Sequence, residues 1–221
     1  QVYVGDADGI DRLTQDYFAS KEYTNVIVCT IKEYPRNISS KLFCIKNINY
    51  DKNIKNEREK QTSKDEFMTQ SSDYSFVIWD GKSKGSFANI KRAIKHNKKI
   101  KVYYVDFGRC LEKEELNISY IENIYKSNTG YTLSEIMTKI KSSNIYTNIS
   151  KASELKEWFV NNKIFKQSSD KLEINNNYKN YFIVENYRGN QTIKYKKDVL
   201  DLIAGNSIFG GRERWKILLL I

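Results

Sequence analysis

The 221-residue chain has few of the residue types that several enzyme classes require. It contains one histidine, one proline and three cysteines. The histidine, His96, lies beside Asn97 and two lysines at a predicted helix end, where it complements the helix dipole rather than acting as a catalytic base. Neither a Ser–His–Asp set nor a metal-ligand spacing is visible. We therefore expect no metal site and no histidine-based hydrolase.

The cysteines are widely separated, at Cys29, Cys44 and Cys110. They form no C-x-x-C pair, and an odd number argues against a disulfide framework. No apolar run approaches the length of a membrane span, and no signal peptide is visible. We expect a reducing, cytoplasmic location and no membrane partner.

The formal net charge is +10. Residues 1–110 contain 20 basic and 14 acidic side chains, and residues 111–221 contain 17 and 13. The positive charge is therefore spread over the chain rather than concentrated in a tail. A basic protein favours polyanionic partners. The same excess of lysine also follows from the Lys-, Asn- and Ile-rich composition of an AT-rich genome, so both explanations stay open.

The first half alternates between strand and helix patterns, which predicts a parallel sheet in an α/β, Rossmann-like, three-layer domain over residues 1–106. Predicted strands cover residues 2–4, 26–29, 76–79 and 100–105, and predicted helices cover 10–20, 63–70 and 87–96. In the first helix, Ile10, Leu13 and Phe18 are expected to face inward. Residues 31–63 are polar, contain the only proline and predict a long irregular excursion.

The second half predicts a smaller α+β module. Residues 107–130 resemble a linker, and residues 131–205 give the outline of a winged helix. Thr132 and Glu135 have capping-box spacing before a helical pattern, and Ser153 is positioned to cap a second helix. Residues 181–184 and 192–195 flank a turn and predict a hairpin.

Residues 206–221 read as a C-terminal strand. A doubly wound domain normally has a strand and a helix before a segment such as residues 2–4. The sequence is therefore expected to lack its first strand, and the C-terminal strand either fills that vacant sheet position or begins a further element.

Two glycine-containing loops each join a predicted strand to a predicted helix. A strand, a glycine loop and a helix together present free N–H groups to an anion. We predict that the two loops lie on opposite sides of one crevice at one edge of a single sheet. The candidate ligand- or phosphate-binding residues here are Gly5, Asp6, Ala7, Asp8, Gly9 and Asp11 in the first loop and Asp80, Gly81, Ser83, Gly85 and Ser86 in the second.

Each of these residues also has a structural interpretation. The glycines suit plain turns or close helix packing, and the first-loop aspartates suit capping of the following helix. Asp80 suits a strand-end cap, and Trp79 is either core or pocket wall.

The two loops resemble those of the SLOG superfamily, which includes YspA-like proteins, LOG cytokinin-activating hydrolases and the DNA-processing protein DprA. Gly5, Ala7, Gly9 and Asp11 are similar to its G-x-A-x-G-x-D loop. The segment from Trp79 to Ser86 is similar to the G-x-S-x-G-T loop of the YspA-like branch, with Ser86 in place of threonine. Residues Arg58, Lys64, Asp65 and Met68 resemble its R-N/D-x-x-M segment.

The resemblance covers residues 1–106 and implies a Rossmann-like domain that binds a nucleotide or a nucleotide-derived ligand. Arg58 is expected to be a phosphate partner, or else a solvated loop charge. Asn89 stands where the LOG hydrolases carry their catalytic glutamate, so that activity is not implied. The first strand of the family and its G-S-R loop are also absent from the sequence.

Three functions remain open. The first is a nucleotide-sensing protein, with no other cofactor, coupled to a winged-helix module that binds DNA or a protein. Whether the chain is a monomer or a homo-oligomer stays open. The second is a nucleotide N-glycosidase that uses Asp6, Asp8 or Asp80. The third is a DprA-like single-stranded-DNA-binding protein. On the predicted wing, Arg188 and Lys194 are either nucleic-acid contacts or ordinary surface charges.

Overall fold

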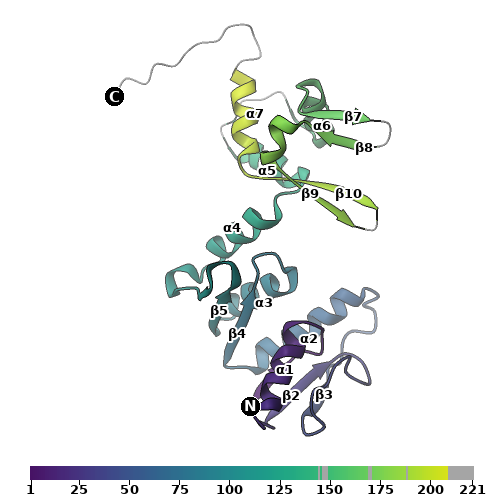
Figure 1. The fold of residues 1–221 in the computed structure, drawn as a ribbon, viewed down its shortest axis with the longest axis vertical. Coiled ribbons are helices and arrows are strands. Elements are labelled where there is room, and N and C mark those ends of the chain that lie inside the picture. Colours follow the sequence, from purple (N-terminus) through teal and green to yellow (C-terminus); the bar gives the residue numbers. More distant parts are fainter. Residues whose placement is uncertain (144, 146–148, 169–170, 188, 209–221) are drawn as a thin grey trace. The chain divides into compact units, whose positions relative to one another are not determined.

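The structure, a computed structural model, describes residues 1–143, 145, 149–168, 171–187 and 189–208 (Figure 1). The chain is a mixed α/β protein that divides into two compact units, Gln1–Glu122 and Asn123–Ile221. The elements that begin in unit 1 are β1 (Val2–Val4), α1 (Ile10–Ser20), β2 (Val26–Thr30), β3 (Cys44–Asn47), α2 (Glu57–Ser71), β4 (Tyr74–Trp79), α3 (Lys84–Lys95), β5 (Lys99–Tyr104), η1 (Val105–Phe107), β6 (Arg109–Cys110), η2 (Lys113–Glu115) and α4 (Ile118–Thr129).

The strands of unit 1 form two three-stranded sheets rather than the single sheet that we predicted. In the first sheet, of order β1-β2-β3, all pairs are parallel. In the second, of order β4-β5-β6, the pair β4–β5 is parallel and the pair β5–β6 is antiparallel. The predicted parallel pairing is confirmed, whereas β1 and β4 each pair with one neighbour and do not belong to the same sheet.

The core of the first sheet lies between the sheet and α1. The buried residues are Val4, Val26, Val28 and Phe43, with Phe18 and Ala19 of α1 packed against them. The prediction that Ile10 and Leu13 face inward was wrong, because both are exposed. Gln15 occupies the buried face of α1 instead, since it has polar partners there.

The excursion predicted over residues 31–63 is more ordered than its composition suggested. It contains β3, which pairs in parallel with β2, and it ends in the first turns of α2. All four residues of β3 are exposed. A strand with no buried face has no alternating apolar pattern from which it could be predicted. The Asn56 side chain caps α2 by accepting a hydrogen bond from the Arg58 N–H.

In the second sheet, α3 packs on β4 and β5. Ile90 and Ala93 of this helix are buried, as are Trp79, Val102 and Tyr104 of the strands. The Trp79 ring stacks on Phe87 at a centroid distance of 6.3 Å, which makes Trp79 a core residue. The segment expected as a linker, residues 107–130, is folded and contains β6, η2 and α4.

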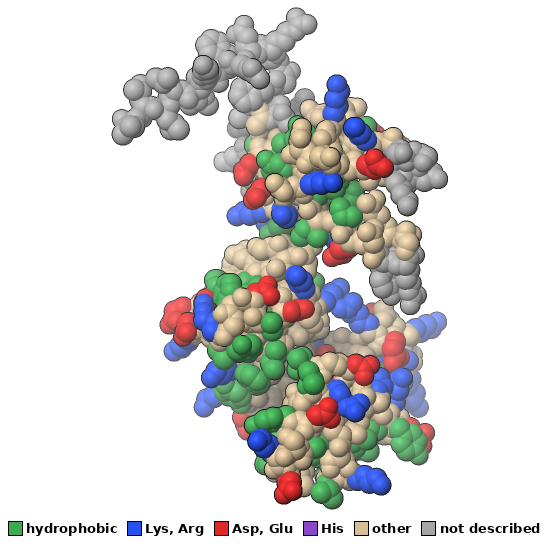
Figure 2. Space-filling view, in the orientation of Figure 1, with side chains coloured by type: hydrophobic (Ala, Val, Ile, Leu, Met, Phe, Trp, Pro, Cys, Tyr) green, Lys and Arg blue, Asp and Glu red, His purple; other side chains and the backbone are tan. Residues whose placement is uncertain are grey.

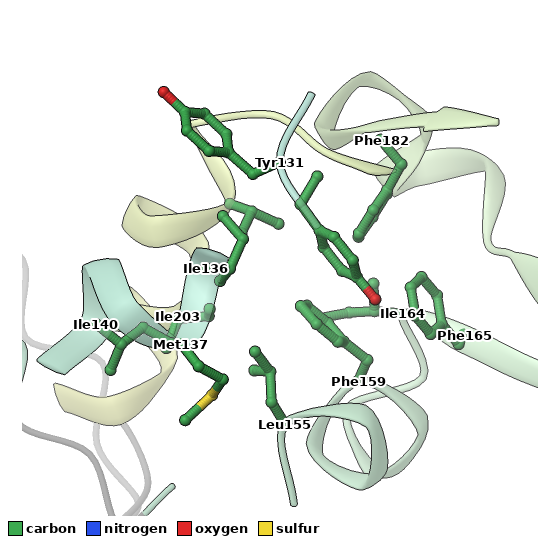
Figure 3. Packing of buried hydrophobic residues seen from close by; sticks show 12 residues of the cluster. Tyr131, Ile136, Met137, Ile140, Leu155, Phe159, Ile164, Phe165, Phe182 and Ile203 are labelled. Carbon is green, nitrogen blue, oxygen red and sulfur yellow. The ribbon is translucent and has the colours of Figure 1, made fainter. Parts of the chain in front are cut away.

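Unit 2 is built around a core of aromatic and aliphatic side chains. The ring of Phe159 lies between 5.0 and 5.7 Å, centroid to centroid, from those of Phe165, Phe182 and Tyr195. Figure 3 shows Phe159 together with Phe165 and Phe182. Its elements are α5 (Leu133–Ser142), α6 (Ala152–Asn161), β7 (Phe165–Ser168), β8 (Lys171–Ile174), η3 (Asn176–Tyr181), β9 (Phe182–Tyr187), β10 (Asn190–Tyr195) and α7 (Val199–Ile208).

Two local predictions for unit 2 are confirmed, whereas the prediction that Ser153 caps the second helix was wrong, because α6 begins at Ala152 and its N-cap residue is Lys151. Thr132 and Glu135 form a capping box at α5, and β9 and β10 form the predicted antiparallel hairpin. The hairpin β7–β8, which was not predicted, lies in the sequence between the second helix and β9. Residues 206–208 belong to α7 rather than to a strand, while the rest of the expected C-terminal strand, residues 209–221, lies outside the described residues, as does Arg188.

Candidate functional site

The carboxylate of Asp6, at the end of β1, is an internal ion-pair centre. Its exposed fraction is 1%. Oδ1 accepts hydrogen bonds from Arg36 Nη2 at 2.8 Å and from Lys64 Nζ at 2.9 Å. Oδ2 accepts from Thr30 Oγ1 at 2.9 Å and from the Arg36 N–H at 3.2 Å. The chain itself therefore supplies four donors to this carboxylate.

Electrostatics agree with this geometry. Burial pushes the pKa of Asp6 upward, but the hydrogen bonds from Arg36 and Lys64 outweigh burial and hold the pKa well below its usual range. Lys64 is itself 97% buried, with an exposed fraction of 3%. A charged carboxylate with its hydrogen-bonding capacity filled by protein donors is suited to holding the fold together rather than to contacting a ligand.

The loop after β2 folds over the first glycine loop. Asn37 Nδ2 donates to the backbone oxygen of Asp6 at 3.1 Å and to Asp8 Oδ1 at 2.9 Å. Gln15 Nε2 donates to the Gly5 oxygen at 2.8 Å from beneath the loop. These contacts support the structural interpretation for much of the loop from Gly5 to Gly9.

The side chain of Asp11, in the first turn of α1, contacts the same loop. Its Oδ2 accepts a hydrogen bond from the Ala7 N–H at 3.1 Å. A Cβ atom at position 5 would lie 2.2 Å from that oxygen, so Gly5 is required by the close approach of Asp11. Burial raises the pKa of Asp11, and the hydrogen bond from Ala7 offsets this only in part.

Asp65 is a second carboxylate with a raised pKa. Burial is the main cause; Lys64 and Arg92 oppose it, and the negative charge of Asp11 adds to it. Among the described residues, no side chain or backbone N–H donates to the Asp65 carboxylate. Asp11 and Asp65 are both partly buried. A pair of mutually repelling carboxylates with raised pKa values is typical of functional sites, and structural networks also produce such pairs.

The second glycine loop caps itself with its own side chains. Asp80 Oδ1 accepts from the Lys82 N–H at 2.9 Å and from the Ser83 N–H at 2.6 Å. Burial tends to raise the pKa of Asp80, but these backbone donors lower it below its usual value. Ser83 Oγ accepts from the Ser86 N–H at 3.5 Å and caps α3. Asp80 is thus the strand-end cap that was one of its two interpretations.

Two N–H groups remain at the start of α3. The first four N–H groups of a helix lack partners within it. Phe87 and Ser86 find acceptors at Ser83, but in the described part of the chain no acceptor faces the N–H groups of Lys84 and Gly85. A Cβ atom at Gly85 would have no heavy atom within 4 Å, so there is room beside these groups.

The two loops share a topological position but not a contact. Each follows the carboxyl end of a strand, β1 or β4, yet across the described residues no hydrogen bond or ion pair joins one loop to the other. Arg58 is also apart: it is exposed in the first turn of α2, about 9 Å along the helix axis from Lys64. Asn89 accepts a hydrogen bond from Arg92 Nη1 at 2.6 Å.

Sequence reasoning did not identify Gln15, Thr30, Arg36 and Asn37 as members of the first-loop cluster. The only local signal was Gln15, a polar residue on the expected apolar face of α1. Thr30 is the last residue of β2, and Arg36 and Asn37 come from a segment whose polar composition predicted nothing beyond a loop.

In unit 2, Lys194 lies in β10 and is half-buried. The Cβ atom of Lys194 lies 2.8 Å from the place where a Cβ atom would stand at Gly130, whose φ is +70°. Lys194 therefore contributes to the packing of the hairpin as well as carrying charge. Figure 2 shows Lys and Arg side chains scattered over the visible face rather than collected in one patch.

No family model, curated protein or solved structure matches the chain. Within the described residues, no helix is both long and apolar enough to cross a membrane. Over the same residues, no group of three or more His, Cys, Asp or Glu side chains is arranged to hold a metal ion.

Proposed function

We propose that unit 1 binds a nucleotide or a nucleotide-derived ligand and that the ligand phosphate lies at the N-terminus of α3. The observation that carries this proposal is the pair of N–H groups at Lys84 and Gly85, beside open space and two exposed lysines, Lys82 and Lys84. Backbone N–H groups and the helix dipole together favour an anion at such a position. Because Asp80 already occupies the N–H groups of Lys82 and Ser83, the phosphate contacts the next two residues, which are the first two of α3.

The arrangement of strands supports a Rossmann-like interpretation of unit 1. The order β3-β2-β1 in one sheet and β4-β5 in the other corresponds to the two halves of a doubly wound sheet, with parallel pairs in each. Ligands of such sheets bind outside the carboxyl ends of the strands. Both glycine loops follow such ends. The resemblance to the SLOG superfamily on residues 1–106 supports the same interpretation.

Calorimetric titration with AMP, ADP and NAD⁺ tests this function. Gly85→Asp places a carboxylate where the phosphate is expected, and it should abolish binding through charge repulsion and loss of space. Gly205→Asp is the matched control, because Gly205 also has open space and lies in α7 of unit 2. Absence of binding by the parent protein, or equal affinity of parent and Gly85→Asp, would refute the proposal.

A second candidate, a nucleotide N-glycosidase or related hydrolase, is favoured by the carboxylates of Asp11 and Asp65. A general acid needs a pKa near the working pH, and burial raises the pKa of both. Asp6 and Asp80 are poorer candidates than the sequence suggested, because their pKa values are lowered.

Chromatography of nucleotides after incubation with the protein would detect a released base. Asp65→Asn should remove the activity, while Asp73→Asn, at an exposed position after α2, should not. If the parent protein releases no base from any nucleotide, the hydrolase candidate is excluded and the binding function is not affected.

For unit 2 we propose a winged-helix-like role in binding nucleic acid or a protein. The support is a pair of helices, α5 and α6, followed after β7 and β8 by the β9–β10 hairpin that carries Lys194. Gel shifts with duplex DNA provide the test. Lys194→Gln should weaken binding, whereas Lys163→Gln, in the exposed turn after α6, should leave it unchanged.

A further inference from the structure

One face of the β4–β5 pair exposes two aromatic rings. The exposed fraction is 52% for Tyr74 and 58% for Phe76. Alternate residues of a strand point to the same face, so these two rings lie on one side of β4 and Trp79 lies on the other, where α3 packs. Rings two residues apart on a strand are about 6.6 Å apart along it.

Each ring has a lysine directly beside it on β5. Tyr74 is paired with Lys99, and Phe76 is paired with Lys101, and both lysines are exposed. Neither β4 nor β5 contains an acidic residue; the acidic residues nearest in the sequence are Asp73, just before β4, and Asp80, just after it. The face is therefore both aromatic and positively charged.

This composition restricts what can cover the face. Parallel strands are ordinarily covered on both sides by apolar layers. An apolar layer here would bury two lysine ammonium groups without partners, which is costly. The complementary partner must bring flat apolar groups for the rings and negative charges for the lysines.

Single-stranded nucleic acid has this chemistry, because unpaired bases stack on aromatic side chains while phosphates contact lysines. A duplex keeps its bases stacked inside and offers no free base faces to a sheet. We infer that the Tyr74–Phe76–Lys99–Lys101 face binds single-stranded nucleic acid, with one base on each ring. The inference goes beyond the nucleotide site proposed at α3.

The test measures the fluorescence anisotropy of labelled 20-nucleotide oligo-dT and oligo-rU with the full 221-residue chain. Phe76→Ala and Tyr74→Ala should each weaken binding about tenfold through loss of one stacked base. Phe76→Tyr should restore most of the affinity. Tyr34→Ala is the matched control, since Tyr34 is 73% exposed in the loop after β2 and should not contribute.

The lysines are tested by salt dependence. Lys99→Gln and Lys101→Gln should each reduce the slope of log K against log salt concentration by about 0.7, the value for one phosphate contact on a single strand. Lys41→Gln, at an exposed position before β3, should leave the slope unchanged.

Three results would overturn the inference. The first is equal oligonucleotide affinity for the parent, Phe76→Ala and Tyr74→Ala. The second is binding of a matched duplex as tightly as of the single strands, with the same response to the variants. The third is absence of oligonucleotide binding by the parent protein; a dimer seen by light scattering that Phe76→Ala dissociates would then show that a second copy covers the face. Gly85→Asp should leave oligonucleotide binding intact, which separates this test from that of the α3 site.

Discussion

Asp6 joins three segments through one carboxylate: the end of β2, the loop that follows it and the middle of α2. At the scale of single residues, a substitution in this cluster should lower the stability of the fold, because a buried charge that has lost its partner is strongly destabilising. Of the two cations that contact Asp6, Lys64 is the less exposed, with a side-chain exposed fraction of 3% against 38% for Arg36, so we use its removal to test the ion pair.

Lys64→Met should lower the free energy of unfolding by about 3 kcal/mol, because Asp6 stays charged and buried with one cation fewer. Urea unfolding followed by circular dichroism measures the change. The control is Lys60→Met in the same helix, where the partly exposed lysine lies 3.9 Å from Glu57. That change should cost no more than about 1 kcal/mol. Equal effects of the two substitutions would contradict the role of Lys64.

Asp11 gives a pH dependence of known sign. Because its pKa is raised in the folded protein, the folded chain keeps a proton that the unfolded chain has already lost. The contribution of Asp11 to stability therefore decreases as pH rises from its ordinary value of 3.8 through the folded pKa, and it is constant above that.

Asp11→Asn removes this ionisation and keeps an oxygen that accepts from the Ala7 N–H. The variant should become more stable relative to the parent as pH increases across that window, as measured by urea unfolding from pH 3.5 to pH 7. A difference between variant and parent that does not change with pH would show that Asp11 has the same pKa in both states.

At the scale of elements, success in prediction depended on whether a segment carries its own local signal. The capping box of Thr132 and Glu135 is encoded within four residues, and the helix that it begins was predicted correctly. The β9–β10 hairpin is likewise encoded by a turn between two β-rich runs. Both are determined by neighbours in the sequence.

The elements that were missed or misread depend on distant partners. The four exposed residues of β3 become a strand only because β2 offers a free edge. Leu13 was expected inside because it is apolar, yet Gln15 is buried because Gly5 supplies an acceptor. No pattern within α1 contains that information, since the acceptor belongs to another element.

The cap of α5 is a suitable test at this scale. Thr132 Oγ1 accepts from the Glu135 N–H at 3.2 Å. Thr132→Ala should cost about 1 kcal/mol of stability in unit 2. Ser134→Ala, at an exposed position within the same first turn, should be neutral or slightly stabilising. Thermal unfolding of both variants measures the difference, and an equal melting temperature for the two would argue against the cap.

At the scale of the whole molecule, each compact unit has a core of its own. The Phe159 ring is fully buried in unit 2 and lies beside four other aromatic rings, those of Trp158, Phe165, Phe182 and Tyr195. The energetic consequence of losing it should therefore be confined to one part of the chain.

Phe159→Ala should destabilise unit 2 by about 3–5 kcal/mol through lost burial and the cavity that remains. Hydrogen exchange followed by mass spectrometry should show faster exchange in residues 131–205 and unchanged exchange in β1, β2 and β4. Faster exchange in both units would mean that they unfold as one cooperative body.

The part of the candidate site that is formed by consecutive residues was predictable from the sequence. The strand, loop and helix from Trp79 to Lys95 are encoded in consecutive residues, and the structure has them in that order. The donors around Asp6 were not predictable, because Thr30, Arg36 and Lys64 are 24, 30 and 58 residues away from it in the sequence and no local pattern connects them to it.

The same carboxylate affects the order of events during folding. Its contacts with Arg36 and Lys64 connect positions 30 and 58 residues apart, so they form only after long loops have closed. A chain emerging from the ribosome cannot complete the cluster until α2 has been synthesised. Until then the Asp6 carboxylate lacks one of its two cationic partners.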